Sequence, residues 1–135
     1  MVQRDVELVR EAITRWGDRE HMDEGFRRYL HPDVEYVEDP AWPGAGHFRG
    51  IDEVRNRWYE YAELLGEAAT LTPEELGAVG DAVLVVAVSR GIAAGSGLRY
   101  EHRWGYVFRL RDGKIVLWEA YLDPENARRS AARDR

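Results

Sequence analysis

The sequence predicts an α+β fold, a cone-shaped α+β barrel in which a curved mixed or antiparallel sheet wraps around N-terminal helices. Apolar residues recur at helical spacing in the first half of the chain and alternate along strands in the second half. Each half therefore has an apolar stripe to bury, and packing the two stripes together leaves a cavity between helices and sheet. At 135 residues, we expect one domain spanning residues 1–135.

The composition is that of a folded, soluble protein, with 44% hydrophobic and 33% charged residues. A net charge of −6 argues against a nucleic-acid partner. The absence of cysteine excludes disulfides, thiol catalysis and thiolate metal sites. Charges begin at the fourth residue and no window reaches transmembrane length, so we expect no signal peptide, no membrane association and a cytoplasmic location.

Two helices are expected before the first strand. The first ends at Gly17-Asp18, and its apolar stripe is Val2, Val6, Val9, Ile13 and Trp16. The second runs from about His21 to Leu30. The turn at 31–33 ends it, because proline disfavours the α conformation in the residue before it. A short strand from Val34 to Val37 follows.

Residues 40–50 are expected to form a loop across the mouth of the cavity. They contain two prolines and three glycines, yet carry Trp42, His47 and Phe48, which need a surface to pack on. The next segment, Ile51 to about Ala68, is predicted to be a helix with one apolar stripe, formed by Val54, Trp58, Tyr61 and Leu65.

Strands are expected after Leu71. The segment Ala82–Ile92 is apolar on both sides, which predicts a strand with both faces covered. The segments Tyr100–Leu110 and Lys114–Leu122 flank a tight turn at Asp112-Gly113 and predict a hairpin. A short helix from Pro124 to Ala132 is expected to close the chain.

The outer face of the predicted sheet keeps several apolar residues. Val107, Leu117 and one side of Ala82–Ile92 would face away from the helices. Because exposed apolar patches of this kind mark interfaces, we expect a homodimer through the outer sheet face.

The strand from Tyr100 to Leu110 combines an aromatic face with polar atoms. Its alternate positions are Tyr100, His102, Trp104, Tyr106, Phe108 and Leu110. A core built for stability alone avoids buried groups that need partners, whereas a pocket uses a few of them to orient a ligand. The alternative is that these tyrosine and tryptophan groups bond to the backbone and have only a structural role.

The order of these elements resembles a known superfamily. Trp16-Gly17-Asp18 closes the first helix, 31-HPDVEYVEDP-40 forms the helix end, strand and loop, and 50-GIDEV-54 opens the third helix. The segment 104-WGYVFRLRDGKIVLWEAYLD-123 forms the final hairpin. Over nearly its whole length the chain resembles the nuclear transport factor 2-like superfamily, specifically its SnoaL-like and ketosteroid-isomerase-like proteins.

The resemblance to ketosteroid isomerases implies a general base. In those enzymes the base is an Asp before a Pro at the end of the first strand, and Asp39 matches that position. Tyr106 stands where they keep a protonated Asp, and their first-helix Tyr has no counterpart near Arg10 or Glu11. The resemblance therefore implies acid–base chemistry other than classical ketosteroid isomerisation.

Two other branches of the superfamily match less well. SnoaL-like cyclases keep an acid/base Asp on the last strand, where the inward positions of this chain are Trp118 and Ala120. The Asp–Arg–Asp arrangement of limonene epoxide hydrolases has no counterpart in the chain.

Three residues are the candidate catalytic groups: Asp39 as a proton shuttle, with Tyr106 and His102 to polarise a ligand oxygen. The alternatives are an Asp that only begins a turn before proline and a histidine with a structural role. The expected pocket wall is Tyr36, Trp42, Trp58, Tyr61, Trp104, Phe108 and Trp118. No metal site and no cofactor are expected, because the four histidines lack paired spacing and phosphate-binding motifs are absent.

Two functions remain open at this point. The first is a cofactor-independent enzyme of isomerase, cyclase or dehydratase type, acting by acid–base chemistry on a small, apolar carbonyl-bearing or polycyclic substrate. The second is a protein of the same fold that binds a small apolar or aromatic ligand without catalysis, or serves as a dimeric scaffold.

Overall fold

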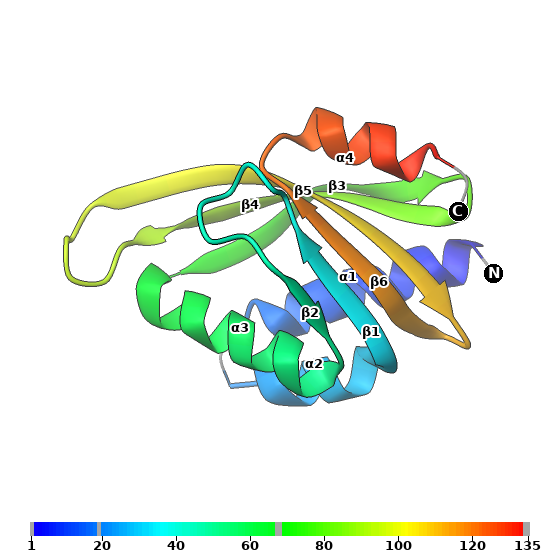
Figure 1. Ribbon diagram of the computed structural model, residues 1–135, viewed down its shortest axis with the longest axis horizontal. Helices are drawn as coiled ribbons and strands as arrows, with labels where there is room; N and C mark the ends of the chain where they lie inside the picture. The colour runs from blue at the N-terminus through cyan, green and yellow to red at the C-terminus, as the bar shows by residue number, and fades with distance from the viewer. Residues whose placement is uncertain (1, 19, 67–68, 134–135) are drawn as a thin grey trace.

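The computed structural model describes residues 2–18, 20–66 and 69–133, which form four helices and one six-stranded sheet (Figure 1). In chain order the elements are α1 (Val2–Trp16), α2 (Met22–Tyr29), β1 (Leu30–Glu38), β2 (His47–Arg49), α3 (Ile51–Leu65), β3 (Thr70–Val79), β4 (Ala82–Ile92), β5 (Arg99–Arg111), β6 (Lys114–Tyr121) and α4 (Pro124–Ala131). Within the described residues, no helix is long and apolar enough to cross a membrane.

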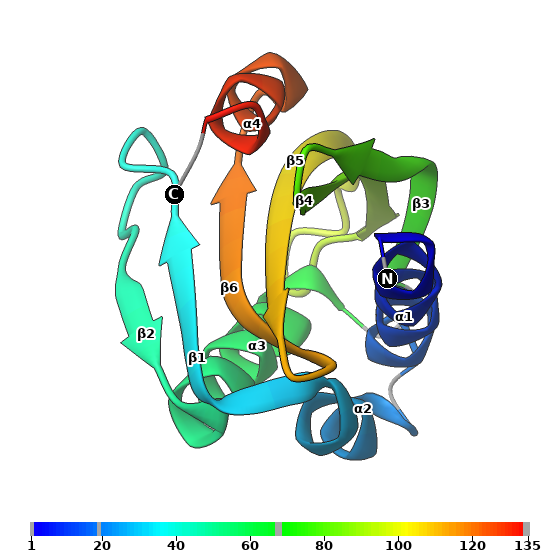
Figure 2. The same cartoon turned by 90° about the vertical axis from the view of Figure 1, so that its right-hand side faces the viewer.

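The sheet is mixed and curved, and it does not close. Its strand order is β2-β1-β6-β5-β4-β3, with β1 and β6 parallel and the other neighbours antiparallel. Figure 2 shows the sheet curling from β2 round to β3, with α4 on the opposite side from α1. The predicted α+β class and the curved sheet around the N-terminal helices are confirmed.

The main core fills the concave side of the sheet. The stripe predicted for α1 is buried from Val6 to Trp16, and α2 contributes Met22, Phe26 and Tyr29. At the centre, the Trp118 ring stacks on Trp16 at 4.5 Å and on Trp58 at 5.2 Å between ring centroids. Aromatic side chains bury large apolar areas, so this cluster holds α1 and α3 against β6.

The largest differences from the sequence prediction lie at β1, at the end of α3 and in the loop at 40–50. Strand β1 begins at Leu30, and its register shifts between Leu30 and Glu35, so the turn expected at 31–33 is an irregular part of the strand. Helix α3 ends at Leu65, because Gly66 adopts φ 87°; Ala68 lies outside the described residues. Part of the expected 40–50 loop pairs with β1 as β2.

The convex side of the sheet is covered by α4. Val107 is fully buried and packs in a second cluster with Ala127 and Ala131 of this helix. A side chain at Gly105 would place its Cβ 2.5 Å from the Ala127 Cβ, so the glycine allows the helix to lie directly on β5. Leu117 is also buried within the single chain. The apolar residues that suggested a dimer face are thus already covered, and the homodimer stays a prediction.

Buried polar contacts fix the position of α4. Arg109 donates to the carbonyl oxygens of Ser130 and Arg133, at 3.4 and 2.9 Å, and pairs with Asp81 at 2.7 Å. Ser130 Oγ donates to the carboxylate of Glu119. Arg109 therefore binds one carbonyl group in the last turn of the helix and one just beyond its end, where a positive charge is favourable.

Candidate ligand cavity

A cavity of about 120 Å³ lies between the concave face of the sheet and helices α1 and α3. Its wall is mostly apolar, and polar side chains enter it from β1, α3, β4 and β5. The lining side chains on which the site depends are Tyr36, Glu38, Asp39, Trp42, Trp58, Tyr61, Ser89, Trp104 and Tyr106.

Of the predicted pocket wall, Tyr36, Trp42, Trp58, Tyr61 and Trp104 line the cavity. Phe108 and Trp118 are fully buried in the core behind it and are outside the lining. Trp42, in the loop after β1, meets the ring of Trp104 edge-on at 5.3 Å. Through this contact, the loop at 40–50, which was expected to cross the cavity mouth, packs against β5.

The most strongly bonded polar group in the lining is Glu38, which the sequence reasoning did not select. Its side chain is 4% exposed. Oε1 accepts from the Gly46 amide at 3.0 Å and from Arg57 Nη2 at 2.8 Å. Oε2 accepts from Arg57 Nε at 3.1 Å and from the Tyr61 hydroxyl. Each carboxylate oxygen thus has two donors.

A sequence signal for Glu38 was available. Side chains alternate across a strand, and Val34, Tyr36 and Glu38 are the buried positions of β1. Placing Tyr36 in the pocket wall therefore placed Glu38 on the same face, whereas Asp39 follows just after the strand ends.

Arg57 ties the mouth loop to α3. Besides pairing with Glu38, its Nη2 donates to the Gly44 carbonyl at 2.9 Å. Its guanidinium lies over the Phe48 and Tyr61 rings, 5.0 and 4.7 Å from their centroids. Hydrogen bonding to the Glu38 carboxylate raises the pKa of Arg57 above its usual range. The paired hydrogen bonds of the planar guanidinium and its contacts with two aromatic rings fix the position of this loop.

Three tyrosines in the lining are neutral hydroxyl donors at physiological pH. Burial raises the pKa of Tyr36 and Tyr106 well above 10, and the nearby Glu38 carboxylate adds to both shifts. Burial and the hydrogen bond to Glu38 likewise raise the pKa of Tyr61. Of these three, Tyr61 donates its hydroxyl to the Glu38 carboxylate. The Tyr106 hydroxyl makes no hydrogen bond within the described residues, although the residue is only 3% exposed.

Asp39 lines the cavity as a half-buried carboxylate fixed by two backbone amides. Oδ1 accepts from the backbone amide of Ala41 at 3.0 Å, within the turn that follows β1. Oδ2 accepts from Leu122 at 3.1 Å, just beyond the end of β6. The carboxylate is therefore held in one orientation, and each oxygen keeps a lone pair for a further donor.

His102 is bonded elsewhere. Its Nε2 lies 3.0 Å from the Leu122 carbonyl oxygen, and its ring meets Trp104 edge-on at 4.6 Å. A carbonyl only accepts, so Nε2 carries the proton. His102 does not belong to the cavity lining, and its contacts position Trp104 and the segment after β6.

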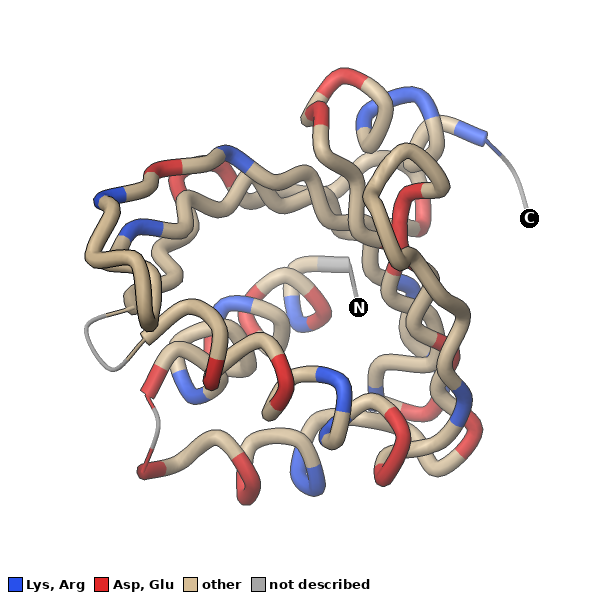
Figure 3. Tube along the Cα trace, turned by 60° about the vertical axis from the view of Figure 1, so that its left-hand side comes forward, with Lys and Arg blue, Asp and Glu red and all other residues tan. Residues whose placement is uncertain are grey.

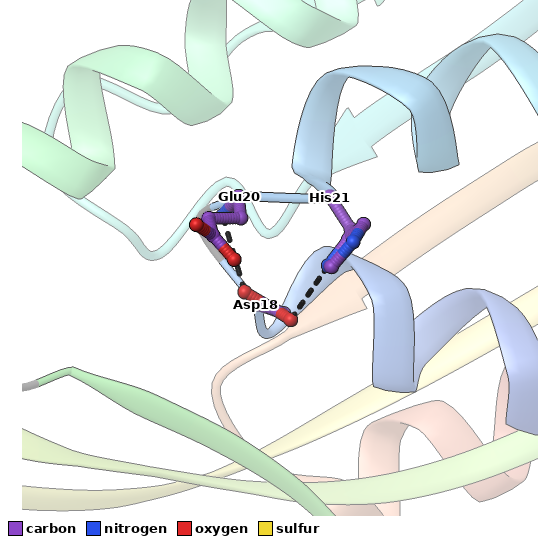
Figure 4. A group of neighbouring side chains, drawn as sticks. All are labelled: Asp18, Glu20 and His21. Carbon is purple, nitrogen blue, oxygen red and sulfur yellow. Dashed lines mark hydrogen bonds and ion pairs between the residues drawn. The ribbon is translucent and has the colours of Figure 1, made fainter.

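One group of possible metal ligands lies away from the cavity. Figure 4 shows Asp18, Glu20 and His21 in the turn between α1 and α2, with ligand atoms within 4.8 Å of one another. All three are exposed. One Asp18 oxygen already accepts from the Glu20 amide and the other contacts the His21 ring at 2.7 Å, and these hydrogen bonds lower the pKa of Asp18. This arrangement caps a turn, and no metal role is assigned to it.

The family is identified by sequence. A sequence model of the SnoaL-like domain matches residues 9–118, which is most of the chain. The chain therefore belongs to the SnoaL-like domain family. No curated protein sequence matches it.

Solved structures of the same fold cover almost the whole chain. A nuclear transport factor 2-like protein from Burkholderia thailandensis is 27% identical, with a TM-score of 0.74 over 96% of this chain and 98% of that chain. TerC, crystallised with polyporic acid, is 22% identical, with a TM-score of 0.76 over 97% and 99%. An epoxide hydrolase-like protein from M. tuberculosis is 21% identical, with a TM-score of 0.66 over 96% and 90%.

Proposed function

We propose that the cavity binds a small, largely apolar molecule bearing a carbonyl or hydroxyl oxygen and transfers a proton on it without a cofactor. The observation that carries this proposal is the Tyr106 hydroxyl, a neutral donor that lines the cavity and is free of hydrogen bonds with the described residues. A ligand that fills the cavity would remove this hydroxyl from water, and a ligand oxygen would then supply the hydrogen-bond partner that it needs. TerC, a protein of the same fold, was crystallised with polyporic acid, which supports the binding of a small organic molecule by this fold.

The proposed reaction uses two residues of the lining. Asp39 accepts a proton from the carbon next to the ligand carbonyl, and the electron pair of the broken C–H bond moves toward the carbonyl oxygen. Tyr106 donates a hydrogen bond to that oxygen as negative charge develops on it. With an unsaturated ketone, protonated Asp39 then gives the proton to a different carbon of the conjugated enolate; the electron pair returns from the oxygen to re-form the carbonyl, which completes an isomerisation. Glu38 acts as a positioning residue, because its two oxygens each have two donors already.

A binding function without catalysis is favoured by a different observation. Both oxygens of Asp39 accept backbone amides, as those of a carboxylate with a purely structural role do. In that case Tyr106 would orient the ligand and no proton would move.

Isotope exchange separates the two functions without knowledge of the natural substrate. Cyclohexanone in D₂O is the probe, and NMR follows the exchange of its hydrogens next to the carbonyl. We expect the protein to accelerate exchange, and Asp39→Asn to reduce the acceleration by about 100-fold or more. Asp33→Asn is the matched control, because Asp33 is an exposed Asp beside a proline on β1, the strand that Asp39 follows.

Binding is measured on the same samples by tryptophan fluorescence. Four of the five tryptophans line the cavity and the fifth stacks on two of them, so a ligand should change the emission. Tyr106→Phe should weaken binding about 3- to 10-fold, in keeping with one neutral hydrogen bond, while the exposed Tyr59→Phe should not. Binding without exchange would support the non-catalytic function, and the absence of both would refute the proposal.

A further inference from the structure

The charged groups in the cavity lining are both carboxylates. Glu38 and Asp39 belong to the lining, and among the described residues no Lys, Arg or His does. The rest of the wall is aromatic, aliphatic or hydroxyl-bearing. A ligand anion would therefore lie close to like charges in surroundings of low dielectric, where repulsion is poorly screened.

Arg57 does not relieve the repulsion between the two carboxylates and a ligand anion. Its donors are already engaged: Nε and Nη2 with Glu38, Nη2 also with the Gly44 carbonyl, and Nη1 with Glu60 at 3.4 Å. Because Glu38 lines the cavity and Arg57 does not, the pair presents its negative end to the ligand. Asp39 adds a further negative charge, held by neutral amides.

The groups left to recognise a ligand are uncharged. The Tyr106 hydroxyl is without a hydrogen bond within the described residues, and the buried Ser89 brings a second hydroxyl to the lining. Burial raises the pKa of Tyr106, so this hydroxyl stays a donor. Neutral hydroxyl donors suit a carbonyl or hydroxyl oxygen.

The volume sets the size of the buried part of the ligand. A dry cavity of about 150 Å³ holds benzene, and this cavity measures about 120 Å³. One six-membered ring is therefore the largest group that fits inside with little adjustment, and a polycyclic ligand would have to extend beyond the cavity.

We propose that the cavity selects the un-ionised form of a single-ring carbonyl or hydroxyl compound and rejects carboxylates and phenolates. This inference rests on the proposed function, since it names the substrate class of the same cavity. It requires that any anion formed during the reaction receives its proton back before the product leaves.

Benzamide and benzoate form the test pair, because they have nearly the same size and shape and differ in charge. Dissociation constants are measured at pH 7 by titration calorimetry with the full chain. We expect benzamide to bind at least tenfold more tightly than benzoate. Equal or tighter binding of benzoate would overturn the charge selection and leave ligand binding intact. Failure of both benzamide and cyclohexanone to bind would overturn this inference together with the proposed function.

Charge-removing variants test whether the two carboxylates are the cause. Asp39→Asn should reduce the preference for benzamide at least threefold, and Asp33→Asn should leave it unchanged. Glu38→Gln removes the counter-ion of Arg57, so benzoate should bind more tightly than to the wild type. If this buried variant does not fold, Asp39→Asn decides the question alone. A preference unchanged in Asp39→Asn would contradict the assignment.

Discussion

Glu38 joins three parts of the structure at the cavity: the end of β1, the loop that follows it and helix α3. A buried carboxylate is stable only when donors replace the water it has lost. The Gly46 amide, Arg57 and Tyr61 supply those donors. Removal of any one of them affects the other two, because all converge on the same two oxygens.

The substitution Glu38→Gln is expected to lower the free energy of unfolding by about 3 kcal/mol, because it leaves Arg57 partly buried without its counter-ion. Urea denaturation followed by circular dichroism measures the loss. The control Glu35→Gln alters an exposed ion pair on the same strand and should cost less than about 0.5 kcal/mol. Equal stabilities of the two variants would contradict the role of Glu38.

The buried tyrosines predict a loss of stability at alkaline pH. In the unfolded chain a tyrosine ionises near pH 10, whereas the folded state holds the pKa of Tyr36 and Tyr106 well above that value. Their contribution is complete below about pH 10 and is lost as the pH rises further, because the unfolded state then binds fewer protons. The expected slope is about 3 kcal/mol per pH unit for the two groups.

Absorbance at 295 nm and circular dichroism, recorded together against pH, check this slope. Tyr36 and Tyr106 should ionise only when the chain unfolds, and Tyr106→Phe should lower the slope by about 1.4 kcal/mol per pH unit, the share of one group. Ionisation of all seven tyrosines in a chain that keeps its native circular dichroism would contradict the prediction.

At the residue scale, the sequence predicted the wall of the cavity better than its polar contacts. Five of seven predicted wall residues line it, because aromatic residues at strand and helix spacing fall on one face. Asp39 and Tyr106 also reach the lining, while His102 bonds to Leu122. Their catalytic roles stay predictions. The His102 side chain points to Leu122 because the segment after β6 passes beside β5, and the spacing of residues along one strand does not reveal such a contact.

At the element scale, the end of α3 sets one boundary of the cavity. Gly66 adopts φ 87° and lies close to the end of β4. A Cβ at this position would lie well inside contact distance of the Ile92 carbonyl oxygen. The glycine therefore both ends the helix and lets it meet β4. Leu65, which precedes it, lines the cavity and accepts a hydrogen bond from Tyr100 at 3.1 Å.

We expect Gly66→Ala to destabilise the protein by about 2–3 kcal/mol, because backbone strain and a clash with a carbonyl oxygen add together. The matched control is Gly95→Ala, with φ 85° and open space around the added Cβ, which should cost only about 1 kcal/mol of strain. Thermal unfolding measures both. Equal melting temperatures would show that the contact with Ile92 is relieved at no cost.

The helices and strands themselves were largely predictable, and their ends were not. Apolar periodicity identified α1, α3 and the three C-terminal strands, since it reports which face of each element is buried. Strand β2 was missed because it has three residues and depends on pairing with Glu35, Tyr36 and Val37. A strand this short has no period of its own to detect.

At the scale of the whole molecule, α4 changes the expectation for assembly. It covers Val107, so a homodimer through the outer face would have to use the surface around it. That surface is charged, with pairs such as Arg103–Glu74 and Arg90–Glu101. Figure 3 shows both signs of charge distributed over the outside of the fold.

The homodimer, if formed there, should be sensitive to salt. Sedimentation velocity at low ionic strength is expected to give twice the 15.6 kDa chain mass, with dissociation as sodium chloride rises toward 1 M, where charges beyond about 3 Å are screened. A mass of one chain at every salt concentration would rule out the dimer.

The sequence by itself determined the α+β class, the single curved sheet and the aromatic wall of a cavity, because burial patterns repeat with the geometry of each element. Tertiary structure decided the rest. It paired Glu38 with Arg57, 19 residues further along the chain, gave Asp39 its bond to Leu122, and laid α4 over the convex face. These contacts depend on how far the sheet bends and where distant segments meet, so the charge and the size of the cavity emerge only when the chain is folded.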